Sequence, residues 1–447
     1  MIRQMQIVRP HNFEEYFLSL LKQIYKNRNL SVEEVSQWLS SAPLKTYYRV
    51  NTLKTTPLEI ITSINEQLSK LTRLKNSDKK PSVKVHTHFS DCIVVLPMDR
   101  SLLDLSPKHG EIIIDIATGQ SALRGSNIFA PGIMGMTSEI QVDSNISVYA
   151  DLAKGCKRGY QKYYDDPLKI FVGNGIAKMN RRQLFNGDMN PKGIAVEMTD
   201  PITGIPSFTL PDECGMLQNL PSIITGHALD VNENNLKVLD MCAAPGNKTT
   251  HIAILMNNKG TIDAIDKSKI KLKKVDLRCE HFGITNVRIH HFDSLINVDL
   301  DNRNSDNENK PPFKVELFDR VLLDAPCSNL GQRPLLKIDA DANLIKSFPV
   351  LQRKLLKNAV DLVKPGGILI YSTCTITLEE NEQNVAWVLE KFPQMELLPI
   401  NSQIGSSGIT QVGLNDNYCE LVRRFGPENV EDDCIGFFIA KFQKKKK

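Results

Sequence analysis

The feature that most constrains the fold is a repeated alternation of short apolar runs and helical segments in the second half of the chain. From residue 217 onward, runs of strand length are separated by stretches with helical spacing. The runs cover residues 237–241, 261–265, 287–291, 321–323, 368–372 and 436–442. This alternation is typical of a doubly wound, mostly parallel sheet with helices on both faces. The sequence therefore predicts an α/β fold for this part.

The preceding parts have different patterns, which indicates three domains. In residues 1–108, Ser31 with Glu34 resembles the capping box of a helix, and the mixed pattern predicts a small α+β unit. Helices are also expected at 13–24 and 58–71, and strands at 47–51, 83–88 and 92–96. Residues 109–203 hold short β-rich runs between glycine turns, with little helical periodicity, which is typical of a compact β barrel. We interpret this barrel as a module inserted before the α/β domain at 204–447.

Two stretches of the third domain are expected to interrupt its regular pattern. A helix predicted at 351–363 is followed by residues 364–367, Lys-Pro-Gly-Gly, which is a common way to end a helix. Residues 300–312 are polar and of low complexity. We expect a surface loop there, with no further role.

Composition and charge exclude several classes of protein. The hydrophobic fraction of 41% and the charged fraction of 24% are those of a globular protein. A net charge of +4 implies no strong overall attraction to polyanions, so a nucleic-acid site would have to be a local patch. Nine cysteines without a C-x-x-C pair disfavour a zinc module and a disulfide scaffold. We therefore expect a cytoplasmic protein without a metal, a membrane span or an obligate protein partner.

Two of the predicted strands end near cysteines. The run 321–323 leads into Asp324 and Cys327, and the run 368–372 leads into Cys374. In an open α/β sheet, ligands and reactive groups gather at the C-terminal ends of the strands. We therefore expect thiolate chemistry on a bound ring at this edge. By position alone, Cys327 is the first candidate for the attacking thiol because it lies beside an acid.

The loop after the predicted strand at 237–241 has the small residues of a cofactor site. Its candidate residues are Cys242, Ala243, Ala244, Pro245, Gly246, Asn247 and Lys248. A phosphate-binding P-loop would need glycines in place of Cys242 and Asn247, and a dinucleotide fingerprint would need more glycines than Gly246 alone. A nucleoside cofactor without a pyrophosphate requires only tight turns. The loop therefore favours a cofactor of this third kind.

Acids at the ends of the following strands support this interpretation. Asp266 ends the second strand about 20 residues after the loop, where a carboxylate can accept both ribose hydroxyls. Asp293 follows the third strand and is a candidate for holding the adenine amino group. The alternative is that each acid caps the following helix. Together with Asp324, the acids are in register and favour a site, and S-adenosylmethionine is the cofactor that fits.

Three motifs, at residues 242–249, 324–328 and 371–375, together resemble the Sun/NSUN family of RNA cytosine-5 methyltransferases. Residues 217–222 and 436–442 look like the same family, so the resemblance covers 204–447 continuously. It implies a Rossmann-like methyltransferase sheet. Residues 49–54, Arg-Val-Asn-Thr-Leu-Lys, are similar to the N-terminal RNA-binding subdomain of this family.

The inserted module resembles a PUA domain, which binds RNA. Residues 119–133 are similar to the opening of such a domain, and residues 172–175 look like one of its later turns. A PUA insertion at this place is similar to one branch of the family. Members of that branch methylate a cytosine near the 3′ end of the acceptor stem of certain tRNAs and recognise the CCA end through the PUA domain. The resemblance therefore implies the tRNA acceptor stem and CCA end as the partner.

The family pattern also implies a role for each site residue. Cys374 would be the nucleophile that adds to cytosine C6, because C5 is too weak a nucleophile to take a methyl group directly. Cys327 would assist removal of the C5 proton and release of the covalent adduct. Asp324, also expected near the cofactor, would hold the N3 edge of the base, and Lys248 would steer the base and favour a nearby thiolate. Position alone suggests Cys327 as the attacking thiol, whereas the family pattern gives this role to Cys374.

Two positions depart from the family pattern. Asn247 stands where the family usually has glycine, and Asn329 where it usually has a small residue. Asparagine tolerates a left-handed backbone better than most residues, so we expect the loop to keep its shape. The departures would then change cofactor affinity rather than cofactor identity.

Basic and aromatic residues of the inserted module are candidates for RNA contacts. They are Arg124, Lys157, Arg158, Tyr160, Arg181 and Arg182. Tyrosine can stack on exposed bases, and phosphate contacts predict an affinity that falls steeply with salt. Two alternatives stay open at this stage: the same chemistry on mRNA or rRNA, and a catalytically idle RNA-binding protein.

Overall fold

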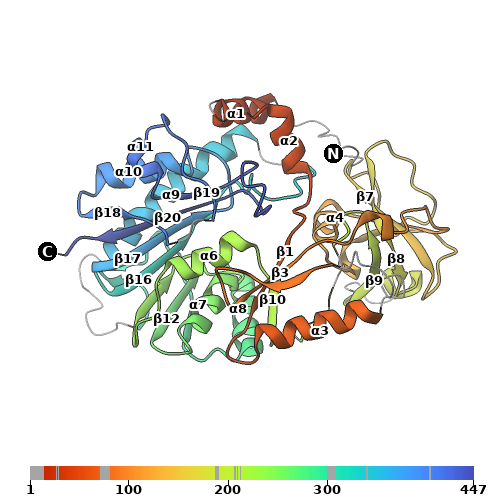
Figure 1. The fold of residues 1–447 in the computed structure, drawn as a ribbon, viewed down its shortest axis with the longest axis horizontal. Coiled ribbons are helices and arrows are strands. Elements are labelled where there is room, and N and C mark those ends of the chain that lie inside the picture. The colour runs from red at the N-terminus through yellow and green to blue at the C-terminus, as the bar shows by residue number, and fades with distance from the viewer. Residues whose placement is uncertain are drawn as a thin grey trace.

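The computed structural model describes residues 15–446 except 27, 29, 71–80, 187–190, 206, 207, 209, 212, 300–308, 339, 340, 402 and 403. The start of the helix expected at 13 and most of the loop expected at 300–312 lie outside the described residues. In Figure 1 the large α/β sheet lies on the left and a smaller β-rich part on the right. The N-terminal sheet lies between them.

The largest sheet has eight strands in the order β13-β12-β11-β16-β17-β20-β18, and β19 pairs with β20. Neighbours from β13 to β17 are parallel, whereas β20 is antiparallel to β17, β18 and β19. The bounds are β11 (Lys237–Asp240), β12 (Thr261–Asp266), β13 (Val287–His291), β16 (Phe318–Asp324), β17 (Val363–Thr373), β18 (Met395–Leu398), β19 (Arg423–Phe425) and β20 (Phe437–Lys444). The predicted α/β, Rossmann-like sheet is confirmed.

Helices cover both faces of this sheet. Side chains alternate across a strand: in β11, Leu239 packs with the core under α9 and α10, and Val238 packs with the core under α6 and α7. The strands are therefore apolar on both faces, which explains their continuous hydrophobic runs. The helices are α6 (Leu220–Ala228), α7 (Asn247–Leu255), α8 (Lys269–Phe282), α9 (Ala342–Leu362) and α10 (Glu382–Lys391).

The junction of α9 and β17 differs from the prediction. The helix begins at Ala342, earlier than the expected 351, and it contains Pro349. A proline usually marks a helix start or break, so the sequence pattern hides the first turns. Residues 364–367 do not follow the helix as a terminating turn but belong to β17. They form an irregularity in its pairing with β16, because the register shifts after Val363.

The N-terminal part contains a four-stranded antiparallel sheet in the order β10-β1-β3-β2 with α3 packed on it. Its elements are β1 (Thr46–Val50), α3 (Pro57–Lys70), β2 (Val83–Val85), β3 (Cys92–Val95) and β10 (Gly215–Leu217). Strand β10 pairs with β1, although the sequence analysis placed this segment beyond residue 204 with the α/β domain. The chain thus returns to the first sheet after the inserted part, and local sequence does not reveal such a long-range pairing.

Helices α1 (Glu15–Tyr25) and α2 (Val32–Ser40) precede the N-terminal sheet in the chain and pack on the α/β part. The capping box of Ser31 and Glu34 at the start of α2 is confirmed. Buried residues of both helices share a core with Leu330 and Leu335, which follow β16, and with Ile376, which follows β17. The two helices therefore support the loops that carry the predicted cysteines.

The inserted part forms a six-stranded sheet in the order β5-β9-β8-β7-β4-β6 around its own hydrophobic core. Its elements are β4 (Glu111–Ile114), α4 (Ile116–Leu123), β5 (Ile128–Phe129), β6 (Ile133–Met136), β7 (Asn145–Asp151), β8 (Lys169–Ala177), α5 (Arg181–Phe185) and β9 (Ile194–Pro201). Among the described residues, no pairing joins the edge strands β5 and β6, so hydrogen bonds do not close a barrel. Helix α4, capped by Asp115, is a helix that the sequence analysis missed.

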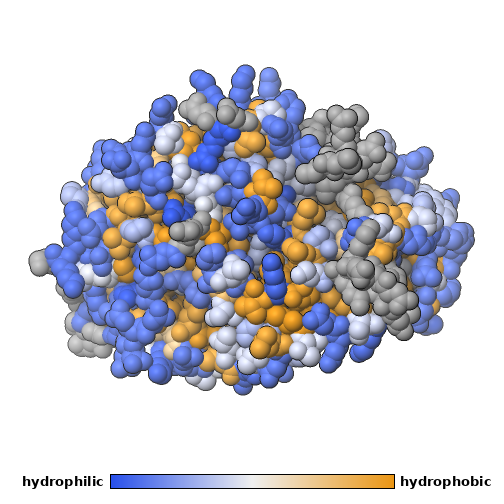
Figure 2. Space-filling model, in the orientation of Figure 1, coloured by the Kyte–Doolittle hydropathy of each residue, from blue (hydrophilic) through white to orange (hydrophobic). Residues whose placement is uncertain are grey.

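The remaining elements are short. They are 3₁₀ turns at Arg100–Leu102 and Ala130–Gly132, strands β14 (Val298–Asp299) and β15 (Phe313–Lys314), and α11 (Asp416–Cys419). On the face shown in Figure 2, hydrophilic side chains predominate, and hydrophobic ones gather in the lower centre, where Figure 1 places β10 and α3. None of the helices in the described part combines the length and apolarity that a bilayer crossing needs.

Candidate active site

Five loops at one edge of the large sheet bring most predicted site residues together. Because β13, β12, β11, β16 and β17 are parallel, their C-terminal ends meet at the same edge. In this order, the loops carry Asp293, Asp266, Cys242, Asp324 and Cys374. The chain order reverses at β11, since β12 and β13 lie on one side and β16 and β17 on the other. Ligands of open α/β sheets bind at such a switch point.

The loop between β11 and α7 is a tight turn that requires glycine. Gly246 has φ +99° and caps α7 at its N-terminus. A Cβ added there would lie 3.1 Å from Cα of Val275, so the backbone of α8 would crowd a side chain. Asn247 is the first residue of α7 and takes helical, not left-handed, backbone. The reason given for tolerating asparagine there is therefore wrong, because Gly246 alone takes the left-handed conformation in this loop.

Asp266 supports the cofactor loop directly. Its Oδ2 accepts a hydrogen bond from the Ala244 amide at 3.2 Å, and its Oδ1 accepts one from the Ser268 amide at 2.8 Å. Helix α8 is capped by Ser268, so the alternative that Asp266 caps it is wrong. Asp293 accepts a hydrogen bond from the Leu295 amide at 2.9 Å in a turn before β14. Both acids remain partly exposed at the sheet edge.

Asp240, which the sequence analysis did not single out, adds a buried carboxyl beneath the loop. It is 1% exposed, and its Oδ2 accepts a hydrogen bond from Thr249 Oγ1 at 2.7 Å. Its Oδ1 is buried without a hydrogen-bond partner. Burial, reinforced by the negative charge of Asp324, raises the pKa of Asp240 to about 7. Such an orphaned polar atom and a glycine cradle are features of a loop built to approach a ligand closely.

Lys248 and Asp324 form an ion pair across the site. Lys248 Nζ lies 2.7 Å from Asp324 Oδ2, and Ser372 Oγ donates a hydrogen bond to Asp324 Oδ1 at 2.7 Å. The ammonium also lies 5.2 Å from the ring centroid of Phe437. The pair joins α7, β16 and β17, so it fixes the carboxylate between the cofactor loop and the cysteines.

The two predicted cysteines face each other. Cys327 Sγ and Cys374 Sγ are 3.4 Å apart, and both thiols are free. Cys327 is 6% exposed, whereas Cys374 is partly accessible. The hydrogen bond between the sulfurs raises the pKa of Cys327, which burial raises further, and lowers the pKa of Cys374. The accessible sulfur is thus the one whose thiolate is favoured, as a nucleophile requires.

Asn329 contacts the thiols rather than the cofactor loop. Its Oδ1 lies 2.9 Å from Cys374 Sγ and 3.7 Å from Cys327 Sγ. Its backbone is left-handed with φ +59°, which asparagine tolerates, as the sequence analysis expected. Its position beside both sulfurs indicates an effect on the thiols, and the expected effect on cofactor affinity stays a prediction.

Three consecutive buried residues after Cys374 hold the cysteine loops, and the sequence analysis missed all three. Asn381 brackets Cys374, because its Oδ1 accepts from Thr373 Oγ1 at 2.5 Å and its Nδ2 donates to the Thr375 carbonyl at 3.0 Å. Glu382 pairs with the buried Arg424 at 3.0 Å. Glu380 accepts hydrogen bonds from the loop of Cys327. The only local signal is a polar run at the start of α10, which usually indicates solvent exposure.

Arg49, expected in an RNA-binding segment, is instead buried against the cofactor loop. It is 0% exposed, donates to the Asn247 carbonyl and donates to Thr250 Oγ1 at 3.0 Å. Burial lowers its pKa to about 9. Asn51 of the same motif donates to the Phe282 carbonyl of α8 at 3.0 Å. This motif therefore joins the N-terminal sheet to the candidate active site.

A second contact between the same two parts is a cluster of Asp91, His227 and His251. Nε2 of His227 and of His251 lie 2.9 and 2.8 Å from the two carboxylate oxygens of Asp91. Burial lowers the pKa of His251 to about 4. Burial alone would raise the pKa of Asp91, but hydrogen bonds from both histidines keep it below its ordinary value. The cluster ties the loop before β3 to α6 and α7.

The candidate RNA-binding residues are not equally available. Lys157 and Arg182 are exposed, and Tyr160 packs against Tyr164 with ring centroids 5.7 Å apart. Arg158 donates to the Ile133 carbonyl at 2.8 Å. Arg181 donates to three backbone carbonyls of the inserted part, those of Met136, Gly159 and Tyr160. Its guanidinium is therefore engaged in holding the inserted part together.

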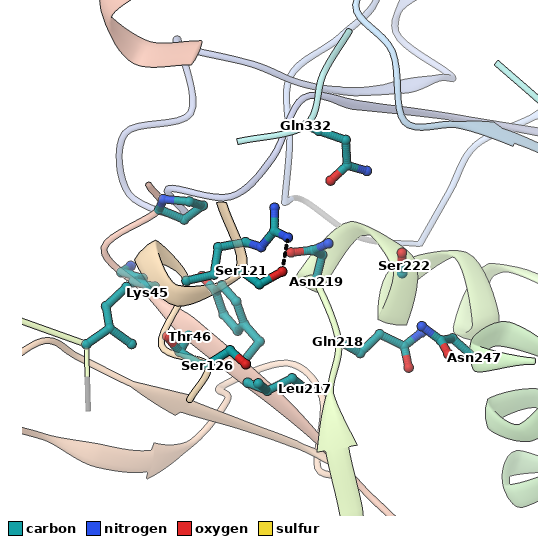
Figure 3. Close-up of a pocket in the computed structure, with 14 residues that line it drawn as sticks. Lys45, Thr46, Ser121, Ser126, Leu217, Gln218, Asn219, Ser222, Asn247 and Gln332 are labelled. Atoms are coloured by element: carbon teal, nitrogen blue, oxygen red, sulfur yellow. Dashed lines mark hydrogen bonds between the residues drawn. The ribbon is translucent and has the colours of Figure 1, made fainter. Parts of the chain in front are cut away.

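Arg124 lines a cavity of about 330 Å³ between the three parts of the chain, shown in Figure 3. The wall is built from Lys45 and Thr46 of the N-terminal part, Ser121 of α4, and Gln218 after β10. Asn247 and Gln332 connect the cavity to the site described above. A hydrogen bond from Gln332 helps to lower the pKa of Cys374, though less than that from Cys327. One residue of the cavity wall, Gln332, is thus a neighbour of the accessible thiol.

A known family matches the α/β part of the chain, and individual proteins match nearly the whole chain. Residues 227–443 match the family described as 16S rRNA methyltransferase RsmB/F. The tRNA (cytosine(72)-C(5))-methyltransferase NSUN6 of Mus musculus is 40% identical over 430 residues, which cover 91% of this chain and 88% of the mouse protein. The tRNA (cytosine(72)-C(5))-methyltransferase of Pyrococcus horikoshii is 33% identical over 97% of this chain and 99% of its own.

A solved structure agrees over the same length. The crystal structure of NSun6 from Pyrococcus horikoshii with SFG is similar with a TM-score of 0.73 and 27% sequence identity. The match covers 97% of this chain and 99% of that chain. Similarity of this extent includes the N-terminal and inserted parts as well as the α/β sheet.

Proposed function

Because the chain belongs to the NSUN-type family of RNA (cytosine-C5)-methyltransferases, we propose that it forms 5-methylcytosine at position 72 of tRNA. The observation that carries this proposal is the thiol pair, Cys327 and Cys374, 3.4 Å apart at the ends of β16 and β17. An idle RNA-binding protein would have no use for an accessible thiol of lowered pKa beside a second thiol. Three relatives that are 33% to 40% identical over 91% to 97% of this chain are named for tRNA cytosine 72. An rRNA (cytosine-C(5))-methyltransferase of Arabidopsis thaliana also matches 88% of this chain, at the lower identity of 30%, so the comparison favours tRNA over rRNA by identity and coverage.

In the proposed reaction, Cys374 adds to C6 of the target cytosine. The addition turns C5 into an enamine carbon that can take a methyl group. Asp324, held by Lys248 and Ser372, contacts the N3 edge, where a proton shared between its carboxyl group and N3 offsets the negative charge that develops there as the thiolate adds. The lowered pKa of Cys374 increases the fraction of thiolate before the base arrives.

Cys327 completes the reaction. Its sulfur lies within reach of the same ring, because it is 3.4 Å from the attacking sulfur. Once C5 carries both a methyl group and a proton, a base must remove that proton so that the bond between Cys374 and C6 can break. Once Cys374 is bonded to C6, its negative charge no longer raises the pKa of Cys327, so Cys327 can lose its own proton to solvent and then take the C5 proton, which releases the RNA.

The residues of the cofactor loop fit S-adenosylmethionine, which would supply the methyl group. The loop from Cys242 to Lys248 approaches closely through Gly246, and Asp266 and Asp293 offer carboxylates at the edges expected for ribose and adenine. The related archaeal protein was crystallised with SFG, an analogue of S-adenosylmethionine, which supports the same cofactor for this chain.

The acceptor end of tRNA would lie across the three parts of the chain. The cavity beside Gln332 and Arg124 offers space for unpaired nucleotides next to Cys374. The inserted part, which resembles a PUA domain, would bind the CCA end, with Lys157 and Arg182 as exposed cations. Nine free thiols fit a reducing compartment, and we propose the cytoplasm.

A methyl-transfer assay tests this proposal. Purified protein is incubated with labelled S-adenosylmethionine and two tRNA transcripts that differ only in cytosine or uridine at position 72. We expect label in the cytosine transcript alone and its loss in Cys374→Ala. Cys214→Ala is the matched control, because Cys214 is also partly exposed but lies at β10. Equal labelling of both transcripts, or of rRNA fragments in preference to tRNA, would contradict the assignment.

A further inference from the structure

Glu380 is a buried carboxylate that contacts both cysteine loops through uncharged donors. It is 0% exposed. Its Oε1 accepts from Ser328 Oγ at 2.5 Å and Thr377 Oγ1 at 2.8 Å, and its Oε2 accepts from the Ser328 amide at 3.0 Å and Gln352 Nε2 at 2.8 Å. Ser328 follows Cys327 directly, and Thr377 lies in the loop after Cys374. The carboxylate is thus shared by the two loops.

The loops are also joined around this carboxylate. The hydroxyls of Ser328 and Thr375 are 2.7 Å apart, so each cysteine has a neighbour in this contact. Gln352 of α9, besides bonding Glu380, donates to the Pro326 carbonyl at 2.9 Å. The distance between the two sulfurs therefore depends on hydrogen bonds that converge on Glu380.

A charge at this position is costly unless it serves the site. Burying a carboxylate is unfavourable, and a neutral side chain of similar volume often stabilises a fold at least as well. All four donors to Glu380 are neutral, so an ion pair does not explain its charge. The hydrogen bond with Cys374, burial and the negative charge of Cys374 raise the pKa of Cys327 most, and the charge of Glu380 raises it further, which disfavours a thiolate there. A thiol that stays protonated can donate its hydrogen to Cys374.

We propose that Glu380 is a positioning residue that divides the roles of the two thiols. It anchors the loop of Cys327 and keeps that sulfur as the hydrogen-bond donor, which leaves the thiolate to Cys374. The proposal deepens the proposed function and rests on it for the identity of the reaction, but the difference between the thiols is a property of the protein alone.

Other groups that face the sulfurs act in opposing directions. Lys248 of α7 lowers the pKa of Cys374, and Asp324 of β16 raises it. Tyr371 of β17 is buried, and its hydroxyl donates to the Glu380 carbonyl at 2.6 Å. Burial raises the pKa of Tyr371, whereas the hydrogen bond from Asn384 and the charge of Arg353 of α9 lower it. Of these groups, Glu380 is the one bonded to the residue after Cys327.

The test measures the reactivity of each thiol without RNA or cofactor. Wild type, Glu380→Gln and the neighbouring control Glu379→Gln are treated with iodoacetamide between pH 6 and pH 10, and alkylation of Cys327 and Cys374 is followed by peptide mass spectrometry. In wild type we expect Cys374 to react first. In Glu380→Gln we expect Cys327 to react about tenfold faster at pH 8, as for a pKa lower by about one unit. Glu379, which is partly exposed, should have no such effect.

Turnover gives an independent readout. Loss of a hydrogen-bonded charge and a small shift of the loop should lower kcat of Glu380→Gln by about tenfold to a hundredfold. The KM values for cofactor and tRNA should stay within about twofold, because Glu380 contacts neither. An unchanged kcat with raised KM values would overturn the proposal, as would identical alkylation profiles in wild type and Glu380→Gln.

A milder variant covers the case in which Glu380→Gln does not fold. Ser328→Ala removes one hydroxyl from the network and should shift the alkylation of Cys327 in the same direction by a smaller factor. In the double variant, the two effects should be less than additive, because both act through one hydrogen bond. Reactivity of Ser328→Ala equal to wild type would overturn the proposal. If thiol reactivities differ as expected but tRNA is not methylated, the proposed function fails and this inference stands.

Discussion

Replacing Lys248 by methionine tests the electrostatic part of the site. The substitution keeps an unbranched side chain of similar length and removes the charge that lies 2.7 Å from Asp324. Asp324 would keep its hydrogen bond from Ser372, so its position should change little. The carboxylate would lose the cation that balances it, and Cys374 would lose one of the groups that lower its pKa. Both effects should raise the free energy of the transition state.

The size of the loss follows from the geometry. At 2.7 Å and an effective dielectric constant of about 20, the attraction between the two charges is about 6 kcal/mol. Desolvation offsets much of this, and 32% of the Asp324 side chain is exposed, so solvent screens the pair. We therefore expect a net loss of about 2 to 3 kcal/mol, which corresponds to a decrease in kcat/KM of about 30- to 150-fold.

The assay is steady-state methyl transfer to a tRNA transcript with cytosine at position 72. Lys391→Met is the control, because Lys391 is an exposed lysine at the end of α10. Thermal unfolding of both variants should stay close to that of wild type. A decrease of less than threefold for Lys248→Met, with the fold intact, would refute the view that this ion pair contributes to the transition state.

Three further substitutions test the surroundings of the site. Gly246→Ala should weaken S-adenosylmethionine binding at least tenfold by calorimetry, because the added Cβ meets Val275 and the left-handed backbone is strained by about 1 to 2 kcal/mol; unchanged affinity would contradict this. Asp240→Asn should stabilise the protein by about 1 to 3 kcal/mol at pH 8, because the folded wild type must ionise a carboxyl whose pKa is raised to about 7. This advantage should shrink towards pH 5, and a constant or inverted difference in thermal unfolding would count against it. Arg49→Met should raise the dissociation constant of the cofactor about fivefold or more and lower the melting temperature, whereas a loss of tRNA affinity alone would indicate a direct RNA contact instead.

Much of the fold was predictable because its signals are local. Each strand of the large sheet is a continuous apolar run, since both faces are covered by helices, and the capping box of Ser31 and Glu34 is a contiguous pattern. The family resemblance is confirmed by relatives that match nearly the whole chain. The expected edge of the sheet also brings Asp266 and Asp324 to one site, because parallel strands end on the same side.

The features that sequence did not reveal depend on contacts between distant segments. Strand β10 pairs with β1, although the inserted part separates them in the sequence. Its three residues contain no pattern that predicts this pairing. Arg49 lies in a segment that resembles an RNA-binding unit, yet it is buried against α7. Glu380 lies in a polar run that predicts solvent exposure, and its hydrogen bonds from the loops of both cysteines and from Gln352 of α9 explain its burial.

We propose that Cys374 forms the bond to cytosine and that Cys327 releases it. The most direct measurement is the covalent adduct between protein and tRNA, isolated on a denaturing gel and mapped by peptide mass spectrometry. We expect Cys327→Ala to accumulate an adduct on the peptide that contains Cys374, and we expect the adduct to vanish in the double variant with Cys374→Ala. An adduct on Cys327 in the Cys374→Ala variant, with none in Cys327→Ala, would contradict the account.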